Sequence, residues 1–234
     1  MRFHSQTAGV TLTAQQPMNN VVRVAYQALA AVLGGTQSLH TNSLDETLAL
    51  PTEEAVRLAL RTQQIIAHET GVADVIDPFG GSYYVESLTD QLEREAEGLF
   101  AEIQSVGGVV KGIEHGWFQR QIARSAEEFQ RDVEAGGRIL VGVNDFVSDD
   151  DHPVEILKIS NDTEENQRRR LARLRAERDG ALVNERLEAL RRAAEQDHNV
   201  IGPMLDCARA YCTLYEIRHA LESVYGAYRE PVFF

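Results

Sequence analysis

The chain has 234 residues, 43% of them hydrophobic and 25% charged, a balance typical of globular proteins with a buried core. It contains no run of about 18 apolar residues, which argues against a transmembrane helix, and its start lacks the apolar region of a signal peptide. The net charge of −13 opposes binding to the negative backbone of a nucleic acid. We therefore expect a cytoplasmic protein that binds neither membranes nor nucleic acids.

The first 76 residues alternate between short polar segments and amphipathic stretches. Residues 2–9 predict a strand that runs into a loop, and residues 17–32 predict a helix that stops at a pair of glycines. Residues 36–43 predict a second strand, and residues 52–70 predict a second helix capped by its first residue. This order of strand, helix, strand and helix is typical of a parallel sheet or barrel.

The chain beyond residue 76 has a mainly helical pattern. Helices are predicted over residues 85–106, 117–135, 164–177 and 181–195, with shorter pieces behind them. Residues 138–144 are rich in branched apolar side chains and predict one further strand, and an acidic loop is expected over 148–153. Thr213 and Glu216 have the spacing of a helix capping box. These patterns divide the chain into residues 1–76, 77–147 and 148–234.

The cysteines and histidines do not indicate a metal site. Cys207 and Cys212 are too few for a disulfide scaffold or a four-cysteine zinc site, so we expect reduced thiols in the core. The histidines follow no metal-ligand spacing, and no metal is predicted.

Polar side chains gather on the two predicted strands. His4 and Gln6 alternate on the first, and Ser38, His40 and Asn42 alternate on the second, so each set points to one side of its strand. Active sites of barrels built from strands and helices lie at the carboxyl ends of the strands, which makes these residues candidates for a ligand site. A hydrogen-bonded polar layer inside a barrel is the alternative, and the spacing alone favours neither.

Longer motifs resemble those of the methylmalonyl-CoA mutase family. They are His4-Ser-Gln-Thr-Ala-Gly9, Leu12-Thr-Ala-Gln-Gln-Pro-Met-Asn-Asn20, Gly35-Thr-Gln-Ser-Leu-His-Thr-Asn-Ser-Leu-Asp-Glu46 and Asp77-Pro-Phe-Gly-Gly-Ser82. The resemblance implies the C-terminal part of the catalytic, large subunit, with an α/β fold. Residues 1–76 would form the last two strands and helices of a (β/α)8 TIM barrel, residues 77–147 a helical wrap with one further strand, and residues 148–234 a helical extension.

The resemblance also implies the chemistry. The expected activity is that of an isomerase that uses adenosylcobalamin to convert methylmalonyl-CoA to succinyl-CoA by radical rearrangement. The large subunit of an isobutyryl- or 2-hydroxyisobutyryl-CoA mutase is one alternative, and a non-catalytic assembly fragment is another. The residues nearest the migrating group are expected upstream of this sequence, so the chain alone is expected to be inactive.

Partners follow from the same resemblance. The family's D-x-H-x-x-G motif, which supplies a histidine to cobalt, is absent from these residues. The cofactor is therefore expected at an interface with a cobalamin-binding domain or a separate small subunit. The resemblance also implies an acyl-CoA substrate and an oligomer.

By the same resemblance, individual residues match binding positions of the family. Three residues match positions that contact the coenzyme A part of the substrate: His4, Gln37 and Ser38. Five match positions around the corrin or the adenosyl group: Gln6, Val10, Asn42, Glu46 and Leu50. Val10 departs from the family, since many members have a tryptophan there. Glu46 is expected at the start of a helix, where the helix dipole favours a carboxylate.

Overall fold

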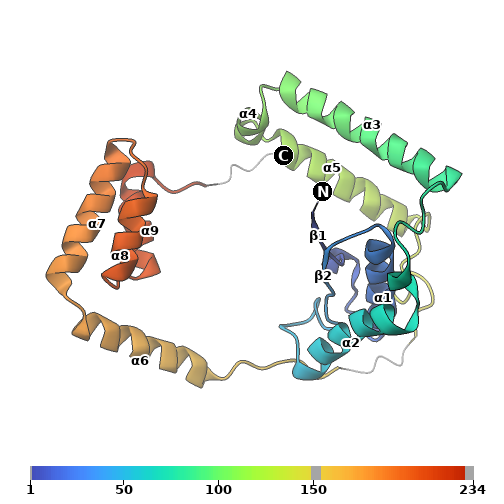
Figure 1. Cartoon of the computed structure of the whole chain (residues 1–234), viewed down its shortest axis with the longest axis horizontal. Coiled ribbons are helices and arrows are strands. Elements are labelled where there is room, and N and C mark those ends of the chain that lie inside the picture. The colour runs from blue at the N-terminus through green and yellow to red at the C-terminus, as the bar shows by residue number, and fades with distance from the viewer. Residues whose placement is uncertain (1, 149–153, 230–234) are drawn as a thin grey trace. The chain divides into compact units, whose positions relative to one another are not determined.

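The computed structural model describes residues 2–148 and 154–229, which are mostly helical with one small parallel sheet (Figure 1). The chain divides between Leu157 and Lys158 into two compact units, which we describe separately. No helix in the described ranges combines the length and the apolar content that a membrane span requires. Residues 149–153, where an acidic loop is predicted, lie outside these ranges. The division into three segments stays a prediction.

The first unit begins with two short strands joined by a helix. β1 (His4–Gln6) pairs in parallel with β2 (Ser38–His40), and α1 (Asn19–Leu33) connects them. α2 (Glu53–Glu69) follows β2 and packs against α1. The predicted order of strand, helix, strand and helix is confirmed, although each strand is only three residues long.

The helices α1 and α2 each bury regularly spaced side chains, most of them small or apolar. The buried residues of α1 are Asn20, Val24 and Ala28, which recur every four positions and so share one face. The Thr52 hydroxyl accepts a hydrogen bond from the N–H of Ala55 at 3.2 Å and caps α2, as predicted. The buried residues of α2 are mostly small, which allows close approach of the two helices: Ala55, Ala59, Thr62 and Ile66.

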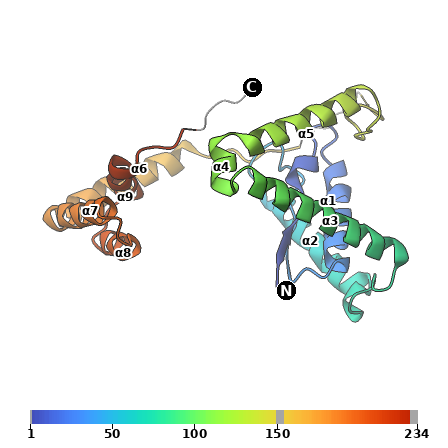
Figure 2. The same cartoon turned by 90° about the horizontal axis from the view of Figure 1, so that it is seen from above.

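A group of three helices completes the helical part of the first unit. They are α3 (Tyr83–Ser105), α4 (Val109–Glu114) and α5 (Trp117–Glu134), and two 3-10 turns lie before them, η1 (Gly9–Thr11) and η2 (Val72–Asp74). Figure 2 shows α4 between the two longer helices. The sequence analysis predicts α3 and α5 but misses α4, which is short and contains a glycine. A Cβ on Gly112 would lie 2.7 Å from the Phe118 ring, so the glycine allows α4 to pack against α5.

The strand predicted over residues 138–144 is wrong. This segment forms a loop with an isolated bridge and joins no sheet in the described residues. The Asn144 side chain donates hydrogen bonds to the carbonyls of Val133 and Arg138, at 2.9 and 2.8 Å. Its oxygen accepts from the N–H of Leu140 at 2.7 Å. These local bonds satisfy backbone groups that a partner strand would otherwise satisfy, and they override the strand propensity of the branched side chains.

The second unit is helical throughout its described residues. Its elements are α6 (Asn161–Glu177), α7 (Gly180–Glu195), α8 (Ile201–Arg209) and α9 (Leu214–Tyr225), and α7 packs against both α8 and α9. The two predicted helices agree with α6 and α7. Cys207 is buried in this core and Cys212 is half-buried, and both are free thiols. Burial raises the pKa of the Cys207 thiol to about 12, so the thiol stays protonated.

A half-buried ion pair ties the end of α6 to the start of α9. The Arg178 guanidinium donates to both carboxylate oxygens of Glu216, at 2.7 and 2.5 Å, and the two side chains are 11% and 21% exposed. The Glu216 carboxylate also accepts from the Thr213 N–H at 2.7 Å, and the Thr213 hydroxyl accepts from the Glu216 N–H at 3.3 Å. The predicted capping box is confirmed. Hydrogen bonding to Arg178 is the main reason that the pKa of Glu216 falls to about 2.

We predict that Glu216→Gln lowers the free energy of unfolding at pH 7 by about 1.5–3 kcal/mol, because the amide cannot replace the charge-assisted hydrogen bonds that the carboxylate accepts from Arg178. Because the folded pKa is lowered, this stabilisation is present above the ordinary glutamate pKa and is lost as the pH falls from about 5 to 2. Urea unfolding of the full chain, followed by circular dichroism at several pH values, measures the difference. Glu222→Gln is the control, since Glu222 pairs with the more exposed Arg218. Equal losses in the two variants would contradict the prediction.

Candidate functional site

The candidate site consists of two loops that follow parallel strands. We call residues 7–16, after β1, the first strand-end loop, and residues 41–52, after β2, the second strand-end loop. Because the strands are parallel, both loops leave the sheet at its carboxyl edge. The predicted cofactor residues lie on these loops or on the last residue of β1, whereas the predicted coenzyme A residues lie at the strand starts.

The three predicted coenzyme A residues are brought together. His4 and Ser38 are directly opposite in the sheet, and His4 Nδ1 lies 2.8 Å from Ser38 Oγ in a hydrogen bond. Gln37 Oε1 accepts from the N–H of Phe3 at 2.8 Å, which fixes its side chain beside the start of β1. All three predicted residues are exposed. Gln37 and Ser38 also line a cavity of about 290 Å³ whose other walls are mostly apolar residues of α1, α2 and η2.

Gln6 and Asn42 also meet across the two strands. The Asn42 side-chain amide lies 3.1 Å from Gln6 Nε2 and 3.2 Å from Thr7 Oγ1. The Asn42 N–H donates to the Thr7 hydroxyl at 2.9 Å, and both of these residues are buried. With the amide turned so that its nitrogen donates to the Thr7 hydroxyl, its oxygen accepts from the N–H of Gly9 at 3.3 Å. The Asn42 amide, which belongs to the second strand-end loop, therefore hydrogen-bonds the first.

Glu46 lies close to the same point but not at a helix start. A Cβ on Gly9 would lie 2.7 Å from the Asn42 side chain and 3.5 Å from Glu46 Oε1, so the glycine leaves room for both. Glu46 is exposed in a turn, with its N–H bonded to the Ser43 carbonyl at 3.2 Å. The first residue of α2 is Glu53, and the expected helix-dipole role of Glu46 is wrong.

Val10 and Leu50 do not pack into the core. Val10, in η1 of the first strand-end loop, is 95% exposed, and Leu50, in the second, is 59% exposed. The first strand-end loop thus presents Val10 to solvent, and the second presents Leu50 together with the less exposed Leu48. Such a surface can bind a ligand that has a broad apolar face and a polar rim.

The sequence analysis missed the buried polar residues behind this surface. Asp45 is 1% exposed, and its two carboxylate oxygens accept from the Ser43 hydroxyl at 2.5 Å and from the Thr52 N–H at 2.9 Å. Asn20 is fully buried on α1. The available signal was the position of Asn20 in the apolar stripe of α1, since a polar residue there needs partners.

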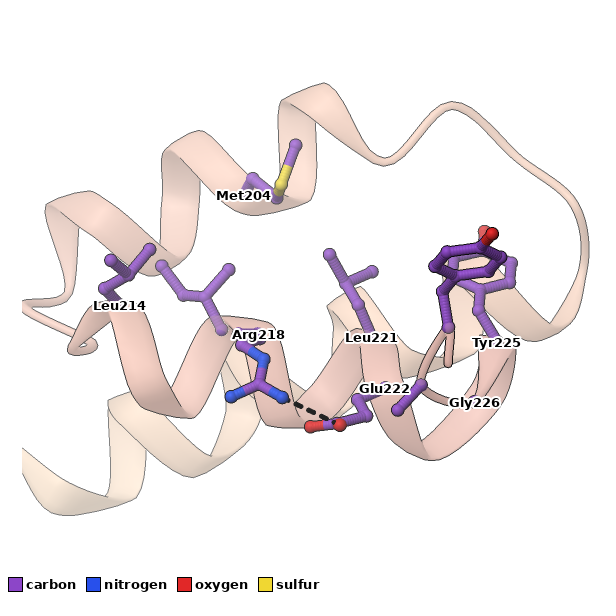
Figure 3. Close-up of a pocket in the computed structure, with 10 residues that line it drawn as sticks. Met204, Leu214, Arg218, Leu221, Glu222, Tyr225 and Gly226 are labelled. Atoms are coloured by element: carbon purple, nitrogen blue, oxygen red, sulfur yellow. Dashed lines mark hydrogen bonds and ion pairs between the residues drawn. The ribbon is translucent and has the colours of Figure 1, made fainter. Parts of the chain in front are cut away.

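A second hollow lies in the second unit. A groove of about 450 Å³ is lined by Met204 of α8, by residues of α9 and by the segment after it (Figure 3). Its walls are mostly apolar, and an ion pair between Arg218 and Glu222 at 2.8 Å borders it. None of the predicted site residues lines this groove. Among the described residues, no group of three His, Cys, Asp or Glu side chains is placed to hold a metal.

Comparison with known proteins gives matches along nearly the whole chain. The profile of the family described as methylmalonyl-CoA mutase matches residues 1–227. The large subunit of 2-hydroxyisobutanoyl-CoA mutase from Aquincola tertiaricarbonis is 49% identical over all of this chain and 42% of its own length. The methylmalonyl-CoA mutases of Cereibacter sphaeroides and Escherichia coli are 44% and 43% identical over 99% of this chain. The chain spans 33% and 32% of their lengths, respectively.

We predict that Thr7→Val lowers the free energy of unfolding by about 1–3 kcal/mol, because valine leaves the buried N–H of Asn42 without its acceptor. Thr89→Val is the control, since the exposed Thr89 hydroxyl bonds only a carbonyl of its own helix, and a change below about 0.5 kcal/mol is expected. Urea unfolding of both variants tests this. Similar losses would show that the Thr7 hydroxyl contributes nothing specific to the joining of the loops.

Proposed function

Because the chain belongs to the methylmalonyl-CoA mutase family, we propose that it forms part of an adenosylcobalamin-dependent acyl-CoA mutase. The proposed reaction is the isomerisation of methylmalonyl-CoA to succinyl-CoA. The observation that carries the proposal is the meeting of Gln6, Asn42 and Glu46 at the carboxyl edge of the sheet, in loops that match the family's motifs. The chain spans about a third to two-fifths of its relatives, so the activity is proposed for the complete enzyme.

We propose further that β1 and β2 are the last two strands of an eight-stranded barrel. Their parallel pairing and the helices that follow each of them support this assignment. Within the described residues each strand has a single partner, so its other edge is open to another strand. The register supports it as well, since His4 lies opposite Ser38 and Gln6 opposite His40, which places these polar side chains on one face. The second unit would then be the helical extension.

The residues of the strand-end loops fit adenosylcobalamin. A corrin has broad apolar faces and a rim of amides, which suit the exposed Val10 and Leu50 and the polar groups of Gln6 and Asn42. Gly9 has no side chain to fill the space above Asn42 and Glu46. When bound, the cofactor supplies the radical chemistry of the rearrangement, and the protein supplies binding, orientation and shielding.

The chain's own side chains would divide the binding between them. The Glu46 carboxylate and the Asn42 amide would hydrogen-bond hydroxyl groups of the adenosyl part. His4, Gln37 and Ser38 would hydrogen-bond the coenzyme A part of the substrate near the strand starts. Glu46, His4, Gln37 and Ser38 are exposed and therefore accessible for these roles, whereas Asn42 is buried.

The substrate has a second candidate. The 2-hydroxyisobutanoyl-CoA mutase large subunit is more similar to this chain, at 49% identity, than the methylmalonyl-CoA mutases at 44% and 43%. A large subunit of that kind would take its cobalamin-binding domain from a separate small subunit. That partner, an oligomeric assembly and a cytoplasmic location complete the proposal. A purely structural role in assembly remains the non-enzymatic alternative.

We predict that the purified chain, given adenosylcobalamin and methylmalonyl-CoA, forms no succinyl-CoA, because it supplies only some of the family's residues. The complete enzyme with its cobalamin-binding partner should form it. Measuring kcat/KM for methylmalonyl-CoA and 2-hydroxyisobutyryl-CoA decides between the two substrates. Turnover by the chain alone would contradict the prediction.

For Glu46→Gln in the complete mutase, we predict at least a tenfold loss of cofactor affinity or turnover, about 1.4 kcal/mol. The melting temperature should change little, because Glu46 is exposed and lies outside the helix. Glu53→Gln is the control, since Glu53 is an exposed carboxylate that pairs with Arg57 on α2. Unchanged binding and kinetics in Glu46→Gln would remove the proposed cofactor role.

A further inference from the structure

One buried side chain joins the two strand-end loops. Asn20 lies in the first turn of α1 and is fully buried. Its Nδ2 donates to the carbonyls of Thr13 and Leu44, both at 2.9 Å. Its Oδ1 accepts from the N–H of Thr13 at 3.0 Å and from the Arg23 guanidinium at 2.8 Å. The amide thus uses both of its donors and both of its acceptor positions.

The two loop partners of Asn20 are both backbone groups. Thr13 belongs to the first strand-end loop and Leu44 to the second. The Leu44 carbonyl lies two residues after Asn42 and two before Glu46, so a bond to it controls where the turn holding Glu46 sits. An aspartate of the same shape could not donate both bonds, and a serine could not span both loops.

Arg23 supports the Asn20 side chain from behind. Its guanidinium bonds Asn20 Oδ1 and, at 2.9 Å, the Thr13 hydroxyl. Its other terminal nitrogen donates to the Val141 carbonyl at 2.7 Å. Through this bond the loop where a strand was predicted contributes to the site, because it anchors the side chain that orients Asn20.

We propose that Asn20 is a positioning residue for cofactor binding: it holds the two strand-end loops in one register, so that Asn42 and Glu46 are presented together. The inference rests on the proposed function, because the relative position of the two loops matters for binding only if Asn42 and Glu46 both contact the cofactor. An error of about 1 Å in the placement of binding groups is enough to lower activity by two orders of magnitude. A side chain that only filled the core would stabilise the fold without affecting the loops.

The test compares Asn20→Ala with Val24→Ala in the complete mutase, prepared without cofactor. Val24 lies one turn further along the same buried face of α1, so its truncation also costs stability and serves as the matched control. Amide hydrogen exchange should become faster in both strand-end loops of Asn20→Ala and stay unchanged there in Val24→Ala. Equal exchange in the two variants overturns the proposal.

Cofactor affinity gives the second measurement. Titration with adenosylcobalamin should show a Kd at least tenfold higher for Asn20→Ala, and less than threefold higher for Val24→Ala. Should Asn20→Ala not fold, Arg23→Met keeps the Asn20 amide and removes the bonds of Arg23 to Asn20, to the Thr13 hydroxyl and to the Val141 carbonyl. It should raise the Kd about threefold, with faster exchange in the first strand-end loop. The proposal is overturned if Asn20→Ala binds adenosylcobalamin with an unchanged Kd while Glu46→Gln binds it more weakly. If Glu46→Gln also binds normally, the proposed cofactor site itself has failed.

Discussion

The parallel pairing of β1 with β2 is the constraint on which the site depends. Side chains on a strand alternate between its faces, so a slip of one residue would move His4 and Gln6 away from Ser38 and Asn42. The strands are too short to specify their register through their own hydrogen bonds alone. Hydrogen bonds made by side chains just beyond the ladder supply the remaining specificity, above all the one that the Thr7 hydroxyl accepts from the backbone N–H of Asn42.

Burial makes these polar bonds strong determinants of structure. Thr7, Asn20, Asn42 and Asp45 are each at most 6% exposed, and leaving a buried polar group without a partner costs more than its hydrogen bond contributes. Loops placed in another arrangement would leave several such groups unsatisfied together. The network therefore selects one arrangement of the two loops, and the exposed Glu46 inherits its position from buried neighbours.

Much of this architecture is predictable from the sequence, and the failures have physical causes. Apolar spacing and caps predicted α1, α2, α3 and α5, because such signals are local. The strand predicted over residues 138–144 does not form, because the Asn144 side chain hydrogen-bonds the backbone locally. The helix α4 was missed because Gly112 weakens the helical pattern in the sequence, whereas in the fold the same glycine allows close packing against Phe118. The family motifs pointed to the candidate binding residues. The buried Asn20 and Asp45 were missed, since their partners include backbone groups of the loops, whose positions depend on the fold.

The two strand-end loops leave apolar side chains uncovered at the surface. Val10 and Leu50 remain exposed, and each strand has an unpaired edge within the described residues. The free energy falls when a ligand covers apolar side chains that are exposed to water. Covering them therefore contributes to the affinity for a ligand with an apolar face. On the proposed function, the corrin would cover these side chains from one side and a cobalamin-binding partner would close the other. On the same proposal, Val10 would offer less apolar area than the tryptophan expected there from the family resemblance, and the polar contacts of Asn42 and Glu46 would carry more of the binding.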